Sequence, residues 1–153
     1  MNLNIVLFNP EIPHNTGAIG RVCVCLDARL HLIQPLGFSL RDKHLQRSGL
    51  DYWKNVDLVL HRSWNHFLEA EQPEHMSFVS AKARTSCFEH KFRIGEYIVF
   101  GPEADGLPAE FHAKYDGAFL TIPMPGRHAR SLNLATAAAI VAYEAFRQIR
   151  EKG

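Results

Sequence analysis

The sequence predicts an α/β protein built on a parallel β-sheet, and two observations lead to this fold class. Apolar runs typical of buried strands occupy residues 3–8 and 30–33, and the segment between them has a helical pattern that extends to about Leu26,. A strand, a helix and a second strand in succession form a βαβ unit, whose strands pair in parallel. Further short apolar runs alternate with polar or helical segments along the rest of the chain. We therefore expect one α/β domain over residues 1–153.

The N-terminal half contains most of the predicted elements. The first strand, Leu3–Phe8, ends at Asn9, and Asn15 or Thr16 is a candidate N-cap for the first helix,. The second strand is ended by Pro35. The elements expected next are a short charged helix (39–46), an aromatic loop (49–53), a strand (56–60), a helix (64–71) and a strand (76–80).

The C-terminal half ends in the longest predicted helix. Residues 82–93 are polar and basic without a clear period, so we expect a loop with one helical turn there,. Next are a buried strand (97–100), a short helix (108–114) and a last strand (118–122). Ser131 is the candidate N-cap of the final helix, which extends to Ile149,. Its expected buried face consists of Ala138, Val141, Ala142, Ala145, Phe146 and Ile149.

Composition excludes several classes of protein. The net charge of +1 gives no global field for a nucleic-acid partner, although basic residues cluster locally,. Three cysteines do not form a disulfide framework in 153 residues,. We expect Cys23 and Cys25 to be buried thiols, since a closed metal site would need further ligands. Without a signal peptide or an apolar run long enough to span a bilayer, the sequence predicts a soluble cytoplasmic protein with no membrane partner.

Three irregular loops follow apolar strands: residues 9–17, 101–108 and 123–130. Each contains Gly and Pro for an unusual backbone path, together with polar groups that can face a ligand. In open parallel sheets, ligands bind beyond the carboxyl ends of the strands. The three loops therefore predict a composite pocket. None of them matches a dinucleotide-binding or phosphate-loop motif.

Five polar residues near these loops are candidates for function. Arg21 could instead be an ordinary surface or salt-bridge residue without a functional role. Glu103 could instead accept hydrogen bonds from backbone N–H groups of its own turn. Asn133, expected one turn into an apolar helix, needs a partner if it is buried. His14 and His128 could act as acid–base residues. The sequence contains no recognisable catalytic triad, glycosidase carboxylate pair or metal-ligand spacing, so no metal is expected.

Three segments, in chain order, resemble the three motifs of the SPOUT superfamily of RNA methyltransferases. They are Asn9…Asn15-x-Gly17-x-x-x-Arg21, Phe100-Gly101-Pro102-Glu103-x-x-Gly106-Leu107 and Ile122-Pro123-Met124…Ser131-Leu132-Asn133-Leu134. Within the superfamily the chain is similar to the short TrmL (YibK-like) tRNA ribose methyltransferases, which share the loop at 49–53 and have no added RNA-binding domain. The resemblance covers essentially the whole chain.

This resemblance implies a parallel-sheet, three-layer SPOUT fold with a deep C-terminal trefoil knot, and a homodimer with the first and last helices at its interface. It also implies methyl transfer from S-adenosylmethionine to the ribose 2′-hydroxyl of wobble nucleotide 34, a cytidine or modified uridine, in the anticodon stem-loop of a tRNA. The residues implied to line the S-adenosylmethionine site are Val79, Gly101, Ile122, Met124, Ser131 and Leu132.

The resemblance further implies catalytic roles for Arg21 and Asn133. Arg21 matches an arginine proposed as a general base in the superfamily, but a guanidinium stays protonated at ordinary pH. We therefore expect Arg21 to hold an RNA phosphate or hydroxyl group, and Asn133 to position the reacting groups. The principal RNA contacts expected are Arg21, Arg41, Arg127 and Arg130. Further contacts are expected from Lys43, Arg47, Lys82 and Arg84, with stacking on Tyr52 or Trp53.

Three alternatives remain open from the sequence. The protein could be a ribose methyltransferase for another tRNA or rRNA position, or a non-catalytic RNA-binding protein on the same scaffold. It could also be an α/β enzyme acting on a small molecule, although that function would not account for the basic clusters.

Overall fold

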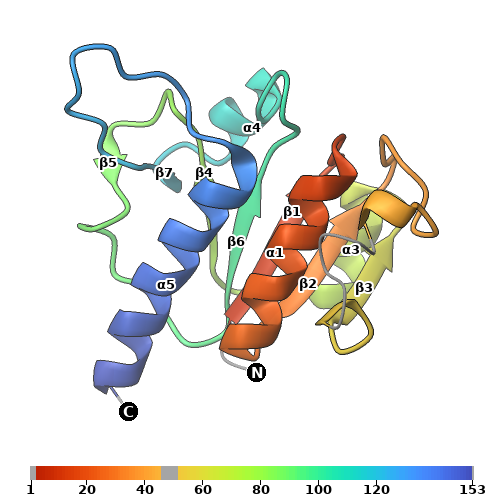
Figure 1. The fold of residues 1–153 in the computed structure, drawn as a ribbon. Helices are drawn as coiled ribbons and strands as arrows, with labels where there is room; N and C mark the ends of the chain where they lie inside the picture. The colour runs from red at the N-terminus through yellow and green to blue at the C-terminus, as the bar shows by residue number, and fades with distance from the viewer. Residues whose placement is uncertain (1–2, 46–51, 153) are drawn as a thin grey trace.

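The computed structural model describes residues 3–45 and 52–152, and its seven strands form one sheet in which all pairs are parallel (Figure 1). The strand order is β3-β2-β1-β6-β4-β7-β5. The strands are β1 (Leu3–Phe8), β2 (Arg29–Ile33), β3 (Asp57–His61), β4 (Met76–Val79), β5 (Thr85–Ser86), β6 (Glu96–Phe100) and β7 (Phe119–Thr121). The predicted α/β class is confirmed. The knot stays a prediction, based on the resemblance.

Helices cover both faces of the sheet. Figure 1 shows α1 and α5 side by side on one face of the sheet, while α3 and α4 lie on the opposite face. Their bounds are α1 (Pro13–Leu26), α3 (Trp64–Glu71), α4 (Ala109–Lys114) and α5 (Leu134–Lys152). None of the helices in the described residues is long and apolar enough to cross a membrane.

Two hydrophobic clusters lie on opposite faces of the sheet. Successive side chains of a strand point to opposite faces, so Ile5 and Leu7 of β1 join the cluster beneath α1 and α5, whereas Val6 joins the one beneath α3 and α4. The expected face of α5 is buried except for Phe146, which is 40% exposed. Strands buried on both faces read as continuous apolar runs, which is why the sequence located them well.

The starts of both major helices differ from the prediction. Helix α1 begins at Pro13, because proline suits the first helical position, and Asn15 and Thr16 lie buried inside it instead of capping it. Helix α5 begins at Leu134, three residues after the expected cap at Ser131. Asn133 is the cap: its Oδ1 accepts from the backbone N–H groups of residues 135 and 136 at 2.8 and 3.2 Å.

Other local predictions also need correction. The segment 82–93 contains the short strand β5, which pairs with β7 at the edge of the sheet. Cys23 is buried as expected, but Cys25 is exposed. Of the predicted helix at 39–46, the described residues show helical structure at 43–45. Arg47 and residues 49–51 of the predicted aromatic loop lie outside the described residues.

Candidate functional site

A cavity of about 480 Å³ opens at the carboxyl ends of β4, β6 and β7. Val79 is the last residue of β4, while Gly101 and Ile122 come directly after β6 and β7. Because these strands run in parallel, their ends meet at one edge of the sheet, and all three residues line the cavity. The predicted composite pocket therefore exists at this edge.

The second loop makes a close turn that depends on glycine. A Cβ atom at Gly101 would lie 2.4 Å from the backbone nitrogen of Leu107 and 2.5 Å from the carbonyl carbon of Gly106. Backbone atoms cannot move aside as a flexible side chain can, so a larger residue at 101 would displace the turn. The N–H of Gly106 donates to Pro102 O at 3.0 Å, and Gly106 has a φ of +67°, which favours glycine.

A chain of polar contacts joins the first two loops to each other and to the start of α5. The Glu103 carboxylate accepts from the backbone N–H groups of Glu11 and Ile12, each at 2.8 Å, and from the Asn15 side chain at 3.1 Å. Asn15 Oδ1 in turn accepts from Asn133 Nδ2 at 3.0 Å. Glu11 reciprocates, because its Oε1 accepts from the N–H of residue 104 at 2.9 Å. Glu103 thus braces the second loop against the first, and Asn133 adds the start of α5.

The structure places the predicted site residues in two groups. All six residues predicted to line a cofactor site do line this cavity, and so does Asn133. Those six are Val79, Gly101, Ile122, Met124, Ser131 and Leu132. Arg21, Arg41, Arg127 and Arg130 are exposed and do not line it. Lys82, which the sequence suggested as an RNA contact, does line the cavity.

Sequence reasoning did not single out four polar residues of the cavity wall, namely Ser80, Asp105, His112 and Thr121. Thr121 ends β7 and could have been found from its place before the third loop. His112 lies on α4, and nothing in its local pattern pointed to the cavity.

Arg21 lies on the exposed side of α1, away from the cavity lining. Its guanidinium carbon is 4.7 Å from the centre of the Tyr52 ring, a distance typical of a cation–π contact. Trp53 is less available for stacking on RNA than expected, since its ring packs against Gly20 of α1 and joins the core cluster beneath α1.

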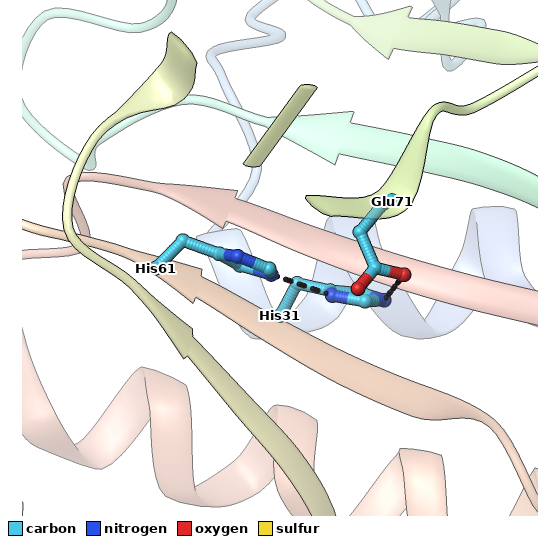
Figure 2. A group of neighbouring side chains, drawn as sticks. All are labelled: His31, His61 and Glu71. Atoms are coloured by element: carbon cyan, nitrogen blue, oxygen red, sulfur yellow. Dashed lines mark hydrogen bonds and ion pairs between the residues drawn. The ribbon is translucent and has the colours of Figure 1, made fainter. Parts of the chain in front are cut away.

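A second group of titratable side chains, His31 of β2, His61 of β3 and Glu71 of α3, lies together on one side of the sheet (Figure 2). None of the three lines the cavity. His31 Nδ1 and His61 Nε2 are 3.0 Å apart, with ring centroids separated by 5.2 Å and ring planes inclined by 19°. The rings are therefore nearly coplanar and lie end to end, so the two nitrogens face each other. Asn4 Nδ2 donates to Gly95 O, so its Oδ1 accepts from His31 Nε2–H at 3.0 Å. His31 Nδ1 then accepts from His61 Nε2–H.

This geometry describes a hydrogen-bonded chain and not a metal centre. A zinc ion would need both nitrogens to converge on it at about 2.0–2.1 Å, whereas here they point at each other. Glu71 lies 3.9 Å from His31 Nε2 and accepts from the Tyr97 hydroxyl at 2.9 Å. Burial, with the neighbouring His61 and Arg29 charges, lowers the pKa of His31 to about 3. Burial also lowers the pKa of His61.

Comparison with known proteins assigns the family. Residues 2–143 match the SpoU rRNA Methylase family. The chain belongs to this family. It is 49% identical over 150 residues to the tRNA (cytidine(34)-2′-O)-methyltransferase of Saccharophagus degradans, covering 95% of both chains. Identity to the enzyme of the same name from Escherichia coli is 42% over 152 residues, covering 99% of this chain and 96% of that one. The predicted relationship to the tRNA ribose methyltransferases is confirmed.

Solved structures of SpoU relatives agree with the fold. One, from a study of 2-OH methylation of C/U34 on tRNA, superposes with a TM-score of 0.88 at 50% identity over 95% of each chain. Another is the SpoU methyltransferase AviRb from Streptomyces viridochromogenes in complex with the cofactor AdoMet. It has a TM-score of 0.84 at 26% identity, covering 99% of this chain and 62% of that one.

Proposed function

We propose that this SpoU-family protein transfers a methyl group from S-adenosylmethionine to the ribose 2′-hydroxyl of wobble nucleotide 34 of tRNA, a cytidine or a modified uridine. The observation that carries the proposal is the cavity, which is lined by all six residues predicted for the cofactor site, in a chain 49% identical to an enzyme named for that reaction. One domain, residues 1–153, would contain both the cofactor pocket and the RNA-binding surface, and would act in the cytoplasm without a metal ion.

The cavity suits a ligand of this kind. Its volume of about 480 Å³ lies within the range of small-molecule sites, which are mostly apolar with a few placed polar groups. Val79, Ile122 and Leu132 provide apolar surface, while Ser131 and the backbone at Gly101 provide hydrogen-bonding groups. These residues, with Met124, would hold S-adenosylmethionine. When bound, it supplies an electrophilic methyl group on a sulfonium.

The remaining chemistry falls to groups that orient the RNA. Methyl transfer mainly requires the acceptor oxygen to be held about 3–3.5 Å from the methyl carbon, and to be desolvated. Asn133 lines the cavity and is held by Asn15, which suits it to position the reacting groups. Arg21 would bind a phosphate or the hydroxyl through its N–H donors, because a guanidinium does not accept a proton. The hydroxyl proton would pass to a neighbouring phosphate or water.

Surface charge and exposed apolar groups suggest how larger partners bind. Arg41, Arg127 and Arg130 are exposed and would contact phosphates of the anticodon stem-loop, so tRNA affinity should fall as the salt concentration rises.

Two aromatic side chains of α5 are exposed in the single chain: Tyr143 is 47% exposed and Phe146 is 40% exposed. We propose a homodimer with α1 and α5 at its interface. A site shared between subunits would account for Arg21 lying away from the cavity of its own chain.

The test is to incubate the protein with labelled S-adenosylmethionine and total tRNA, and to map the label by nucleoside mass analysis. Label on the ribose of nucleotide 34 supports the proposal. Label at another tRNA or rRNA position would show that the enzyme modifies a different nucleotide. RNA binding without label would indicate a non-catalytic protein. Arg21→Ala should abolish turnover while leaving the affinity for S-adenosylhomocysteine nearly unchanged. If turnover survives, Arg21 is not catalytic.

A further inference from the structure

The partner of the Arg21 guanidinium is an aromatic ring. No acidic side chain among residues 3–45 and 52–152 forms an ion pair with Arg21. Its contact is the face of the Tyr52 ring, 4.7 Å from the guanidinium carbon. A ring face attracts the cation through its quadrupole but does not occupy its N–H donors. The guanidinium is therefore held in place with its donors still available.

The Tyr52 ring sits on a segment anchored to the same helix. A Cβ atom at Gly20, the neighbour of Arg21, would lie 2.9 and 3.1 Å from two atoms of the Trp53 ring, so that ring lies directly on the α1 backbone. The N–H of Asn55 donates to Tyr52 O at 2.8 Å, which closes the turn. The close fit at Gly20 fixes the path of the segment, and with it the position of Tyr52 beside Arg21.

We propose that Tyr52 is a positioning residue that orients the Arg21 guanidinium toward the RNA. The inference rests on the proposed function, in which Arg21 acts on the phosphate or the 2′-hydroxyl. A long arginine side chain loses conformational freedom when it binds, and a stacked ring removes part of that freedom beforehand. A carboxylate partner would hold Arg21 as well, but would neutralise it and use its donors.

The experiment compares Tyr52→Leu and Tyr52→Phe with the intact protein. Tyr52→Leu should lower kcat by about threefold if only the contact is lost, and by up to about 100-fold if Arg21 moves by 1 Å. S-adenosylhomocysteine affinity and Tm should stay unchanged. Tyr52→Phe keeps the ring face and should restore turnover. Phe88→Leu, which removes an exposed ring near the β5 edge, is the matched control and should change kcat less than twofold.

A second pair of variants separates orientation of Arg21 from direct stacking on RNA. In an Arg21→Gln background the cation is gone, so the further effect of Tyr52→Leu on tRNA affinity, which can be measured without turnover, should shrink below twofold. Equal effects of Tyr52→Leu in both backgrounds would mean that the ring acts on RNA directly, and would overturn the inference. Full turnover in Tyr52→Leu itself would also overturn it. The proposed function fails separately, if the unaltered protein leaves nucleotide 34 unmethylated.

Discussion

Replacing His31 with glutamine should make the stability of the protein much less sensitive to acid. His31 is fully buried, with both ring nitrogens in hydrogen bonds to Asn4 and His61. In the neutral ring only one nitrogen carries a proton, and this arrangement uses it for Asn4. A second proton, on Nδ1, would point at the proton of His61 Nε2 and would bring a buried charge beside His61. The folded protein therefore resists protonation of His31, and its pKa falls from 6.5 to about 3.

The sign and size of the effect follow from linkage. Between pH 6.5 and pH 3 the unfolded chain binds a proton that the folded chain does not, so the free energy of unfolding decreases as pH falls. The full stabilisation from the neutral ring is present above the unfolded pKa. A tenfold change in proton affinity between the folded and unfolded chains corresponds to about 1.4 kcal/mol, so His31 should account for about 2 kcal/mol of lost stability between about pH 7.5 and about pH 5. His61, whose pKa is also lowered, acts in the same direction.

Urea unfolding followed by tryptophan fluorescence measures this directly. The free energy of unfolding should be obtained at both pH values for the unaltered protein, His31→Gln and the exposed-site control His128→Gln. Protein concentration must be held constant, because the proposed dimer would make the apparent stability depend on it. We expect His31→Gln to lose about 2 kcal/mol less than the other two proteins over this pH interval. If all three proteins lose stability equally, the buried ring is not the acid-sensitive group.

Three further predictions concern the cavity. Gly101→Ala should abolish S-adenosylhomocysteine binding in calorimetry, because its Cβ would lie 2.4 Å from the nitrogen of Leu107. Glu103→Gln should weaken the same binding while retaining the fold, since an amide can accept only through its single oxygen and loses the charge that strengthens these hydrogen bonds. Asn133→Ala should lower the free energy of unfolding by about 1 kcal/mol through loss of the helix cap. Asn133→Asp should keep the cap but lose the bond to Asn15, and should therefore reduce turnover more than stability.

Each of these predictions can fail in a distinct way. Normal ligand affinity in Gly101→Ala would mean that the turn can shift without cost. Unchanged affinity in Glu103→Gln would show that the contacts between loops do not shape the cavity. Equal free energies of unfolding for Asn133→Ala and Asn133→Asp would show that the side chain at 133 does not stabilise α5 as a helix cap.

Sequence reasoning located the strands better than the helix starts, for a physical reason. A strand buried on both faces has an apolar run as its signature, whereas a helix start depends on a single hydrogen bond. Ser131 and Asn133 are both good caps by residue type, and only the folded structure decides between them. The cavity residues were found because their motifs resemble those of a known family. Local patterns alone predicted three irregular loops that meet at the carboxyl ends of the strands.

The chain of hydrogen bonds through His31 and His61 could not have been predicted from the sequence. His31 and His61 lie on strands whose register places them near each other, and that register depends on pairing between β2 and β3. The Arg21–Tyr52 contact was missed for a similar reason. An aromatic residue in a loop suggests stacking on RNA, and nothing in the sequence shows that its ring is already in contact with an arginine of α1.

The contact between Asn15 and Asn133 spans 118 positions of the chain, and that between Asn15 and Glu103 spans 88. During synthesis, the first motif leaves the ribosome long before the residue that completes its set of partners. A nascent chain that still lacks α5 cannot close the pocket, however well its first strands have formed. We therefore expect the methyl donor to bind only after α5 has joined the rest of the fold, so that binding indicates a completed chain.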